Sequence, residues 1–140
     1  MMFDYWVSSR MEFTLEDKRE CLETTTTIAG LAMKVRQGGI SALKAEIGAL
    51  DPLNDKLLIK AINLIVGGVI GDEVRKILQN YIIVGNYRNR RLLKRLLVME
   101  GMIALQNGHS PEFIRDFVLA SFFGEGFQQE YAAYTATAVE

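Results

Sequence analysis

The sequence predicts an all-α protein that folds as a compact bundle of five to seven helices. It contains only two prolines and few clusters of turn residues, which argues against the many short strands of an all-β protein. Apolar residues recur at helical spacing in successive segments, and glycines or capping residues separate these segments. The chain has 140 residues, 49% of them apolar and 24% charged, so it can form one domain with its own hydrophobic core.

We expect three regions along the chain. A short N-terminal extension covers residues 1–13, a single helical domain covers residues 14–126, and a C-terminal tail covers residues 127–140. The tail carries apolar residues at i, i+4 and i+7, so it forms either a short docking helix or a frayed end. These residues are Phe127, Tyr131 and Tyr134.

The first helix of the domain is expected to begin at Thr14 and to end or kink at Gly38-Gly39. Thr14 can cap this helix, and Asp17 three residues later forms a capping box with it. Residues 24–27 are β-branched threonines, which are poor helix formers, so a break there is the alternative to one continuous helix. A further amphipathic helix is predicted over residues 40–50, where apolar residues fall at i, i+3, i+7 and i+10.

Three more helices are expected in the middle of the chain. Asp51-Pro52 supplies an N-cap and a proline at the first position of a helix that runs to about Val66. Gly71-Asp72-Glu73 opens the next helix, with its acids at the positive end of the helix dipole. The third helix starts near Tyr87, and each of the last two has one apolar stripe. The stripes are Val74, Ile77, Leu78 and Tyr81, and then Leu92, Leu96, Met99 and Ile103.

Residues 98–123 predict two helices joined by a sharp corner. Gly108 lies where the first of them ends, and Ser110-Pro111 supplies the cap and the first residue of the second. Gly124 is expected to end the second helix. Its buried face is predicted from helical spacing to comprise Ile114, Phe117, Val118 and Ser121, with Phe113 alongside.

The residues that usually carry catalysis are sparse in this chain. Cys21 is the only cysteine, which excludes an internal disulfide or a thiolate metal site and favours a buried, inert thiol over a nucleophile. His109 is the only histidine and lies in the corner, where we interpret it as a polar turn residue. No phosphate-binding glycine motif follows a predicted strand. We therefore expect a protein that is not an enzyme, with no metal, no cofactor and no small-molecule substrate.

No segment has the length and hydrophobicity of a membrane-spanning helix. The longest apolar stretch, residues 57–71, falls short of the roughly 20 residues needed to cross a bilayer, and Lys60 and Asn63 interrupt it. The N-terminus also lacks the apolar run of a secretory signal. We predict a cytoplasmic protein, with membrane association through a partner as a further possibility.

Positive charge gathers in the middle of the chain. Residues 31–111 hold twelve bases and six acids, whereas the two flanking segments are acidic. Five of the bases cover one broad helical face, and we call this group the basic patch: Arg88, Arg90, Arg91, Lys94 and Arg95. It is interpreted first as a solvated face that pairs with the acidic ends. The alternatives are nucleic acid, anionic lipid or an acidic protein partner.

Three segments, taken in order, resemble the cytoplasmic parts of MotA/PomA, the flagellar stator subunits of the MotA/TolQ/ExbB family. They are "LAMKVRQGGISALKAEI", "DPLNDKLLIKAINLIVGGVIGDEVRKILQNYI" and "LLVMEGMIALQNGHSPEFIRDFVLASF". The resemblance covers roughly residues 25–123. The family's transmembrane helices are missing, and "IIVGNYRNRRLLKR" joins the second and third segments directly. The chain is then either a natural soluble relative or a cytoplasmic region joined across a removed membrane hairpin.

The resemblance implies a non-enzymatic protein-interaction domain that meets a motor partner, such as a FliG-like rotor protein, through charged helical surfaces. Arg36 matches the basic position of the family's rotor contact, Lys44 stands where an acid is expected, and Glu46 is the nearest acid. The basic patch lies where the family's chain returns from the membrane, so weak contact with an anionic membrane surface and formation of a homo-oligomer are further expectations. The alternative is a small nucleic-acid-binding or regulatory protein that uses the basic helix 88–95.

Overall fold

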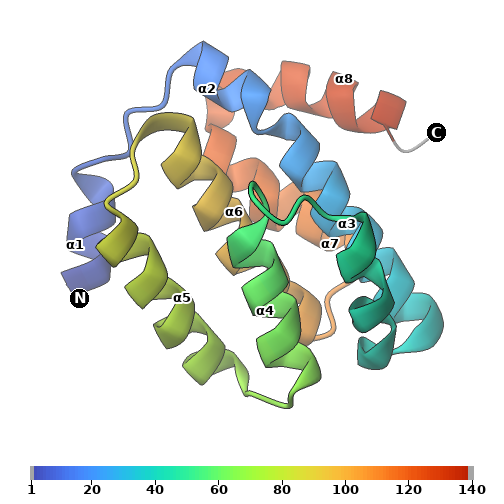
Figure 1. Ribbon diagram of the computed structural model, residues 1–140. Helices are drawn as coiled ribbons and strands as arrows, with labels where there is room; N and C mark the ends of the chain where they lie inside the picture. The colour runs from blue at the N-terminus through green and yellow to red at the C-terminus, as the bar shows by residue number, and fades with distance from the viewer. Residues whose placement is uncertain (1, 139–140) are drawn as a thin grey trace.

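The computed structural model describes residues 2–138, and over this range the protein is all-α, without a strand (Figure 1). The predicted fold class is therefore confirmed, but the predicted number of helices is too low, because this range forms eight α-helices. They are α1 (Met2–Ser8), α2 (Leu15–Glu20), α3 (Leu22–Gly38), α4 (Lys56–Val66), α5 (Gly71–Gly85), α6 (Asn89–Gln106), α7 (Pro111–Phe113) and α8 (Gln128–Ala138). Three narrower helices and one wider helix complete the fold: the 3-10 helices η1 (Ile40–Ala49), η3 (Ala120–Phe123) and η4 (Glu125–Phe127), and the π-helix η2 (Ile114–Leu119).

The protein has more helices than predicted in part because the first predicted helix divides at Cys21 into α2 and α3. The break does not fall in the threonine run 24–27, which is helical and buries Thr24 and Thr25. The hydroxyls of Thr25, Thr26 and Thr27 donate to carbonyls of the preceding turn, as in the 2.6 Å bond from Thr25 Oγ1 to Leu22 O. The capping box at the start of α2 is confirmed. Asp17 N donates to Thr14 Oγ1 at 3.1 Å, and Thr14 N donates to Asp17 Oδ2 at 3.0 Å.

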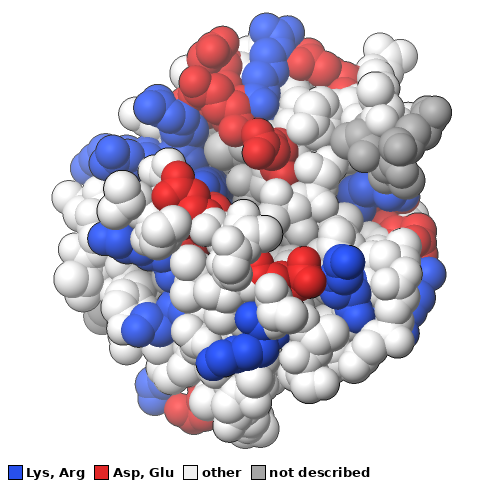
Figure 2. All heavy atoms as spheres, turned by 45° about the vertical axis from the view of Figure 1, so that its right-hand side comes forward, with Lys and Arg blue, Asp and Glu red and all other residues white. Residues whose placement is uncertain are grey.

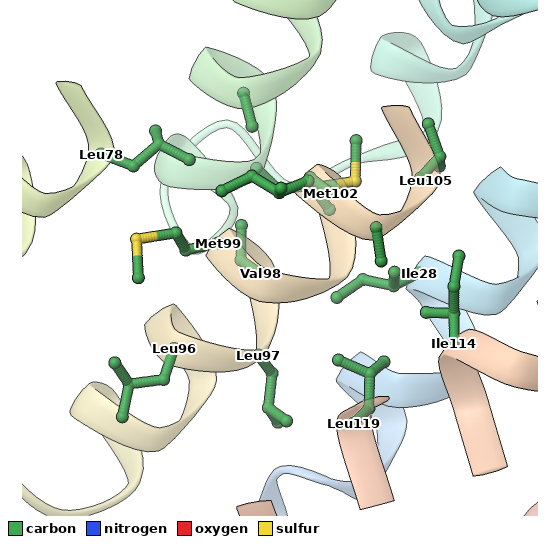
Figure 3. Close-up of a cluster of buried hydrophobic side chains, with 14 of the residues drawn as sticks. Ile28, Leu78, Leu96, Leu97, Val98, Met99, Met102, Leu105, Ile114 and Leu119 are labelled. Atoms are coloured by element: carbon green, nitrogen blue, oxygen red, sulfur yellow. The ribbon is translucent and has the colours of Figure 1, made fainter. Parts of the chain in front are cut away.

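Helix α6 is the centre of the molecule. It packs against α2, α3, α4, α5 and η2, and Figure 1 shows the other helices arranged around it. In the close-up of Figure 3, Met99 projects toward Leu78 of α5, while Leu97 lies on the side of Ile28 from α3 and Leu119 from η2. The four residues predicted for the apolar stripe of this helix are all buried, but the buried surface extends beyond the stripe over most of the second half of the helix. The buried residues of α6 are Leu92, Leu93, Leu96, Leu97, Val98, Met99, Gly101, Met102, Ile103, Ala104 and Leu105.

The absence of a side chain at Gly101 lets α6 lie close to its neighbours. A Cβ atom at this position would stand 2.8 Å from Ile28 Cγ2 and 3.2 Å from Leu119 Cδ2. Both of these side chains are fully buried. A glycine in the interior of a helix is unfavourable by about 0.5–1 kcal/mol relative to alanine, so its presence here is explained by packing and not by helix propensity.

The predicted corner between α6 and α7 is confirmed in its local chemistry. Gly108 has φ +86°, the left-handed conformation that glycine adopts readily, and His109 N donates to Ala104 O at 3.2 Å across the end of α6. Ser110 Oγ accepts from Phe113 N at 3.1 Å, and Pro111 occupies the first turn of α7.

The predicted face of the helix after the corner is right for Ile114, which is fully buried, and for Val118, which packs against the core, but wrong for the other residues. Phe117 is 67% exposed, and Phe113 is also exposed. In the π-helix η2, the wider turn puts Leu119, and not Phe117, on the same side as the buried Ile114. Leu119, Ala120 and Phe123 are buried in the core.

Both ends of the described chain pack on the core. Phe3 and Val7 of α1 are buried, and α1 contacts α5. At the other end, α8 contacts α3 and η3, and its Tyr131 is 2% exposed. Arg19 of α2 forms an ion pair of 2.7 Å with Glu130 of α8, so the tail is docked through both apolar and charged contacts.

Candidate interaction surface

The three residues suggested for a rotor-type contact, Arg36, Lys44 and Glu46, have different surroundings. Arg36, at the end of α3, lies 2.5 Å from Glu112 of α7, and this hydrogen bond lowers the pKa of the Glu112 carboxyl. Lys44 of η1 points to α4, where its Nζ is 3.5 Å from Asn63 Oδ1. Glu46 lines a cleft beside η1. Each of the three residues therefore has a different neighbour.

This cleft has a volume of about 540 Å³ and lies between α3, η1 and the start of α4. Its charged lining residues are Glu20, Glu23, Lys34, Glu46, Asp51, Asp55 and Lys94. On the face shown in Figure 2, acidic side chains gather above and around the middle, with basic side chains among them. The two lysines leave the cleft only partly acidic. Within residues 2–138, no group of three or more His, Cys, Asp or Glu side chains is placed to hold a metal ion.

Two members of the basic patch are paired with acids from other parts of the chain. Arg90 Nε lies 3.4 Å from Glu20 of α2. Lys94 Nζ lies 3.1 Å from Asp55 Oδ1 and donates to Asn54 O at 3.0 Å. The first interpretation of the patch, as a face that pairs with acids, holds for these two cations, although Asp55 belongs to the basic middle of the chain.

Arg95 is held in a different way. Its guanidinium lies 3.6 Å from the ring centroid of Tyr87, and its Nη1 donates to Arg91 O at 3.0 Å. The Tyr87 ring also rests against Gly85, where a Cβ atom would come within 2.1 Å of ring atom Cε2. The ring orients the arginine, but it leaves the positive charge without a carboxylate.

The remaining two members, Arg88 and Arg91, are exposed and form no ion pair with any described residue. The basic patch thus consists of two cations that stabilise the fold, one that stacks on a tyrosine and two that point to solvent. Only the last three have charge available to a partner.

A groove beside the basic patch is lined by two further cations, Lys56 and Lys60. We call it the cationic groove; it has a volume of about 510 Å³ and lies between α4, α5 and the start of α6. Its lining contains no carboxylate from the described part of the chain and consists of Pro52, Lys56, Leu57, Ile59, Lys60, Asn63, Tyr81, Tyr87 and Arg95. Lys60 Nζ lies 5.3 Å from the ring centroid of Tyr81, so this wall repeats the pairing of Arg95 with Tyr87.

Four residues of this groove were not predicted from the sequence. Lys56 and Lys60 are spaced i, i+4, which puts them on one face of α4 and is the signal that could have found them. Tyr81 was assigned to the apolar stripe of α5, yet it is 48% exposed. Tyr87 was interpreted only as the start of a helix.

Cys21 and His109, the two residues considered for catalysis, pack against other parts of the protein. Cys21 is 2% exposed, its Sγ donates to Arg90 O at 3.3 Å, and burial raises the pKa of its thiol to about 12. The His109 ring lies 4.8 Å from the Phe113 ring at the corner.

No helix within residues 2–138 combines the length and the hydrophobicity needed to cross a bilayer.

Comparisons with family models, with curated proteins and with solved structures find no match to this chain. The resemblance to MotA-type subunits therefore remains a prediction made from three segments of the sequence. In the structure, the first of these segments covers the C-terminal part of α3, from Leu31, and most of η1, the second covers α4 and most of α5, and the third covers α6 from Leu96 through to Phe122. The first and the third are joined by the ion pair between Arg36 and Glu112.

Proposed function

We propose that this chain is a non-enzymatic protein-interaction domain, resembling the cytoplasmic region of a MotA-type stator subunit, which binds a rotor-type or other motor partner through a charged helical surface. The observation that supports this proposal is the positive surface formed by cations of α4 and the start of α6, several of which line two adjoining hollows that share Lys56 and Arg95. Its exposed cations, Lys56, Lys60, Arg88 and Arg91, form no ion pair with a described carboxylate. Uncompensated surface charge of one sign steers and orients a partner of the opposite sign.

Arg36 is a weaker basis for the partner surface than this positive surface. Its guanidinium is bonded to Glu112, so a partner carboxylate would have to compete with an acid already in place. The proposed partner surface is accordingly centred on Arg88 and Arg91, with Arg36 outside it.

The test is a binding measurement between the purified chain and a purified candidate partner, taking first the FliG-like rotor protein of the same genome. We expect the double variant Arg88→Glu/Arg91→Glu to lose binding by about tenfold or more, since each reversal replaces an attraction with a repulsion. Lys34→Glu is the matched control, because Lys34 is an exposed cation that lines the cleft beside η1 and not the positive surface. Equal loss in both variants would contradict the assignment of the surface.

A nucleic-acid-binding or regulatory function of the basic helix 88–95 is the second candidate. The observation that favours it is the exposed Tyr81 ring beside Lys60, since bases stack on aromatic rings in basic grooves. Against it, Arg90 and Lys94 already face carboxylates, which leaves few cations for phosphates. Binding to single-stranded DNA or RNA that falls steeply with salt, and that is lost in the Arg88→Glu/Arg91→Glu variant, would favour this second function over the first.

A further inference from the structure

We propose that the cationic groove binds an acidic peptide segment of the partner that carries adjacent bulky apolar side chains, with one of these side chains seated on the groove floor and flanking carboxylates paired with Lys56, Lys60 and Arg95. This inference rests on the proposed function and specifies the partner's chemistry. The shape, the lining and the charge of the groove each support it.

The size of the groove fits a side chain together with a short stretch of backbone. Its volume of about 510 Å³ lies within the range of about 300–1,000 Å³ that ligand sites commonly span. The floor includes Pro52, Leu57 and Ile59, which offer an occupant apolar contact and no hydrogen-bonding side chain. Such a floor contributes affinity only if the occupant brings an apolar group to it.

The charge of the groove is positive and is not neutralised from within. Lys60 and Arg95 lie over the rings of Tyr81 and Tyr87, at 5.3 Å and 3.6 Å from the ring centroids. A ring face holds a cation in place through its quadrupole, but unlike a carboxylate it does not cancel the charge. The two cations are therefore oriented in advance and still attract an anion, which reduces the entropy lost when the anion binds.

The same contacts argue against a nucleic acid as the occupant. The Tyr87 ring is in contact with Gly85 and carries the guanidinium of Arg95, so it does not offer a free face to a base. A phosphate would use the cations but leave the apolar floor in water. Carboxylates next to an apolar side chain match both parts of the lining.

A second hollow extends the track for a peptide. It has a volume of about 650 Å³ and shares Lys56, Tyr87 and Arg95 with the cationic groove, while Arg90, Arg91 and Lys94 line its other side. An extended segment that leaves the groove over Lys56 would thus continue along the basic patch. Among the described residues, Glu20 is the only carboxylate that lines this hollow, and it is already paired with Arg90.

The test uses fluorescence anisotropy of the full chain with a labelled synthetic peptide of sequence EDELFDEE. We expect binding that weakens about tenfold in Lys60→Glu and also weakens in Tyr81→Ala, which removes an exposed ring at little cost to the fold. Lys34→Glu should bind as the parent does. Circular dichroism of each variant confirms that it is folded.

Three further probes fix the chemistry of the occupant. A peptide with serines in place of the central Leu-Phe should bind about tenfold more weakly, because it leaves the floor uncovered. Single-stranded DNA and vesicles containing phosphatidylserine should not displace the labelled peptide from the groove.

The proposal is overturned if the peptide does not bind, if the serine peptide binds equally well, if Lys60→Glu has no effect, or if DNA or vesicles displace the peptide. Its failure can be told apart from failure of the proposed function. If the partner still binds in a manner that depends on Arg88 and Arg91 while the peptide does not, the protein-interaction function stands and the acidic-peptide assignment falls.

Discussion

Replacing Gly101 by alanine tests the packing around α6, because this helix contacts most of the others. The new Cβ would stand 2.8 Å from Ile28 Cγ2 and 3.2 Å from Leu119 Cδ2, in a region where both neighbours are fully buried. Overpacking of this kind costs about 1–3 kcal/mol. The better helix propensity of alanine returns about 0.5–1 kcal/mol, so we expect a net loss of about 1 kcal/mol in the free energy of unfolding.

Gly30→Ala in α3 is the matched control for Gly101→Ala. A Cβ atom at residue 30 would meet no other atom within 4 Å, so only the gain in helix propensity remains, about 0.5–1 kcal/mol of added stability. The difference between the two variants isolates the packing cost, because the propensity gain is common to both. Urea denaturation followed by circular dichroism measures it. Equal stabilisation by both substitutions would refute the close packing of α6 against α3 and η2.

Two further predictions concern the division of the basic patch and the buried ionisable groups. Lys94→Met should lower the free energy of unfolding by about 1 kcal/mol, because Lys94 is partly buried in an ion pair. Arg91→Met should change it by less than about 0.5 kcal/mol, because Arg91 is exposed. Equal effects of the two substitutions in urea denaturation would contradict the division of the basic patch into paired and unpaired cations. Burial raises the pKa of the Cys21 thiol from 9.0 and that of the Tyr131 phenol from 10.0, each to about 12. Both groups are buried in their neutral form, so the stability that depends on this burial is fully present below pH 9 and is lost as the pH rises toward 12. The melting temperature should therefore fall over this pH range. A constant melting temperature would contradict the burial of both groups.

The local sequence was sufficient for the ends of several helices. The capping box of Thr14 and Asp17, the left-handed Gly108 and the cap at Ser110 all depend on residues within a few positions of each other. Such contacts are encoded in short motifs, so they can be read without knowledge of the fold.

The fold after the corner could not be predicted in the same way. The π-helix η2 depends on how its neighbours, α3 and α6 among them, pack around Ile114 and Leu119, and ordinary helical spacing therefore placed Phe117 inside when it is exposed. The division at Cys21 into α2 and α3 was also missed, because only tertiary contacts distinguish one bent helix from two separate ones.

The candidate surface was predicted in part. The cluster of arginines identified the positive end of α6, but the acids that neutralise Arg90 and Lys94 lie on α2 and just before α4, far away in the sequence. The groove was missed for the same reason, since Lys60 and Tyr81 meet only when α4 packs against α5. Charge counted along a chain does not show which charges remain available after folding.

The central claim is that uncompensated cations on α4 and the start of α6 form the partner surface. The most direct test is a titration of the isotope-labelled chain with the rotor-type partner, followed through backbone amide chemical shifts. We predict that the changes concentrate in α4 and in residues 87–95. Changes concentrated instead around Arg36 and Glu112, or no changes at all, would contradict the claim.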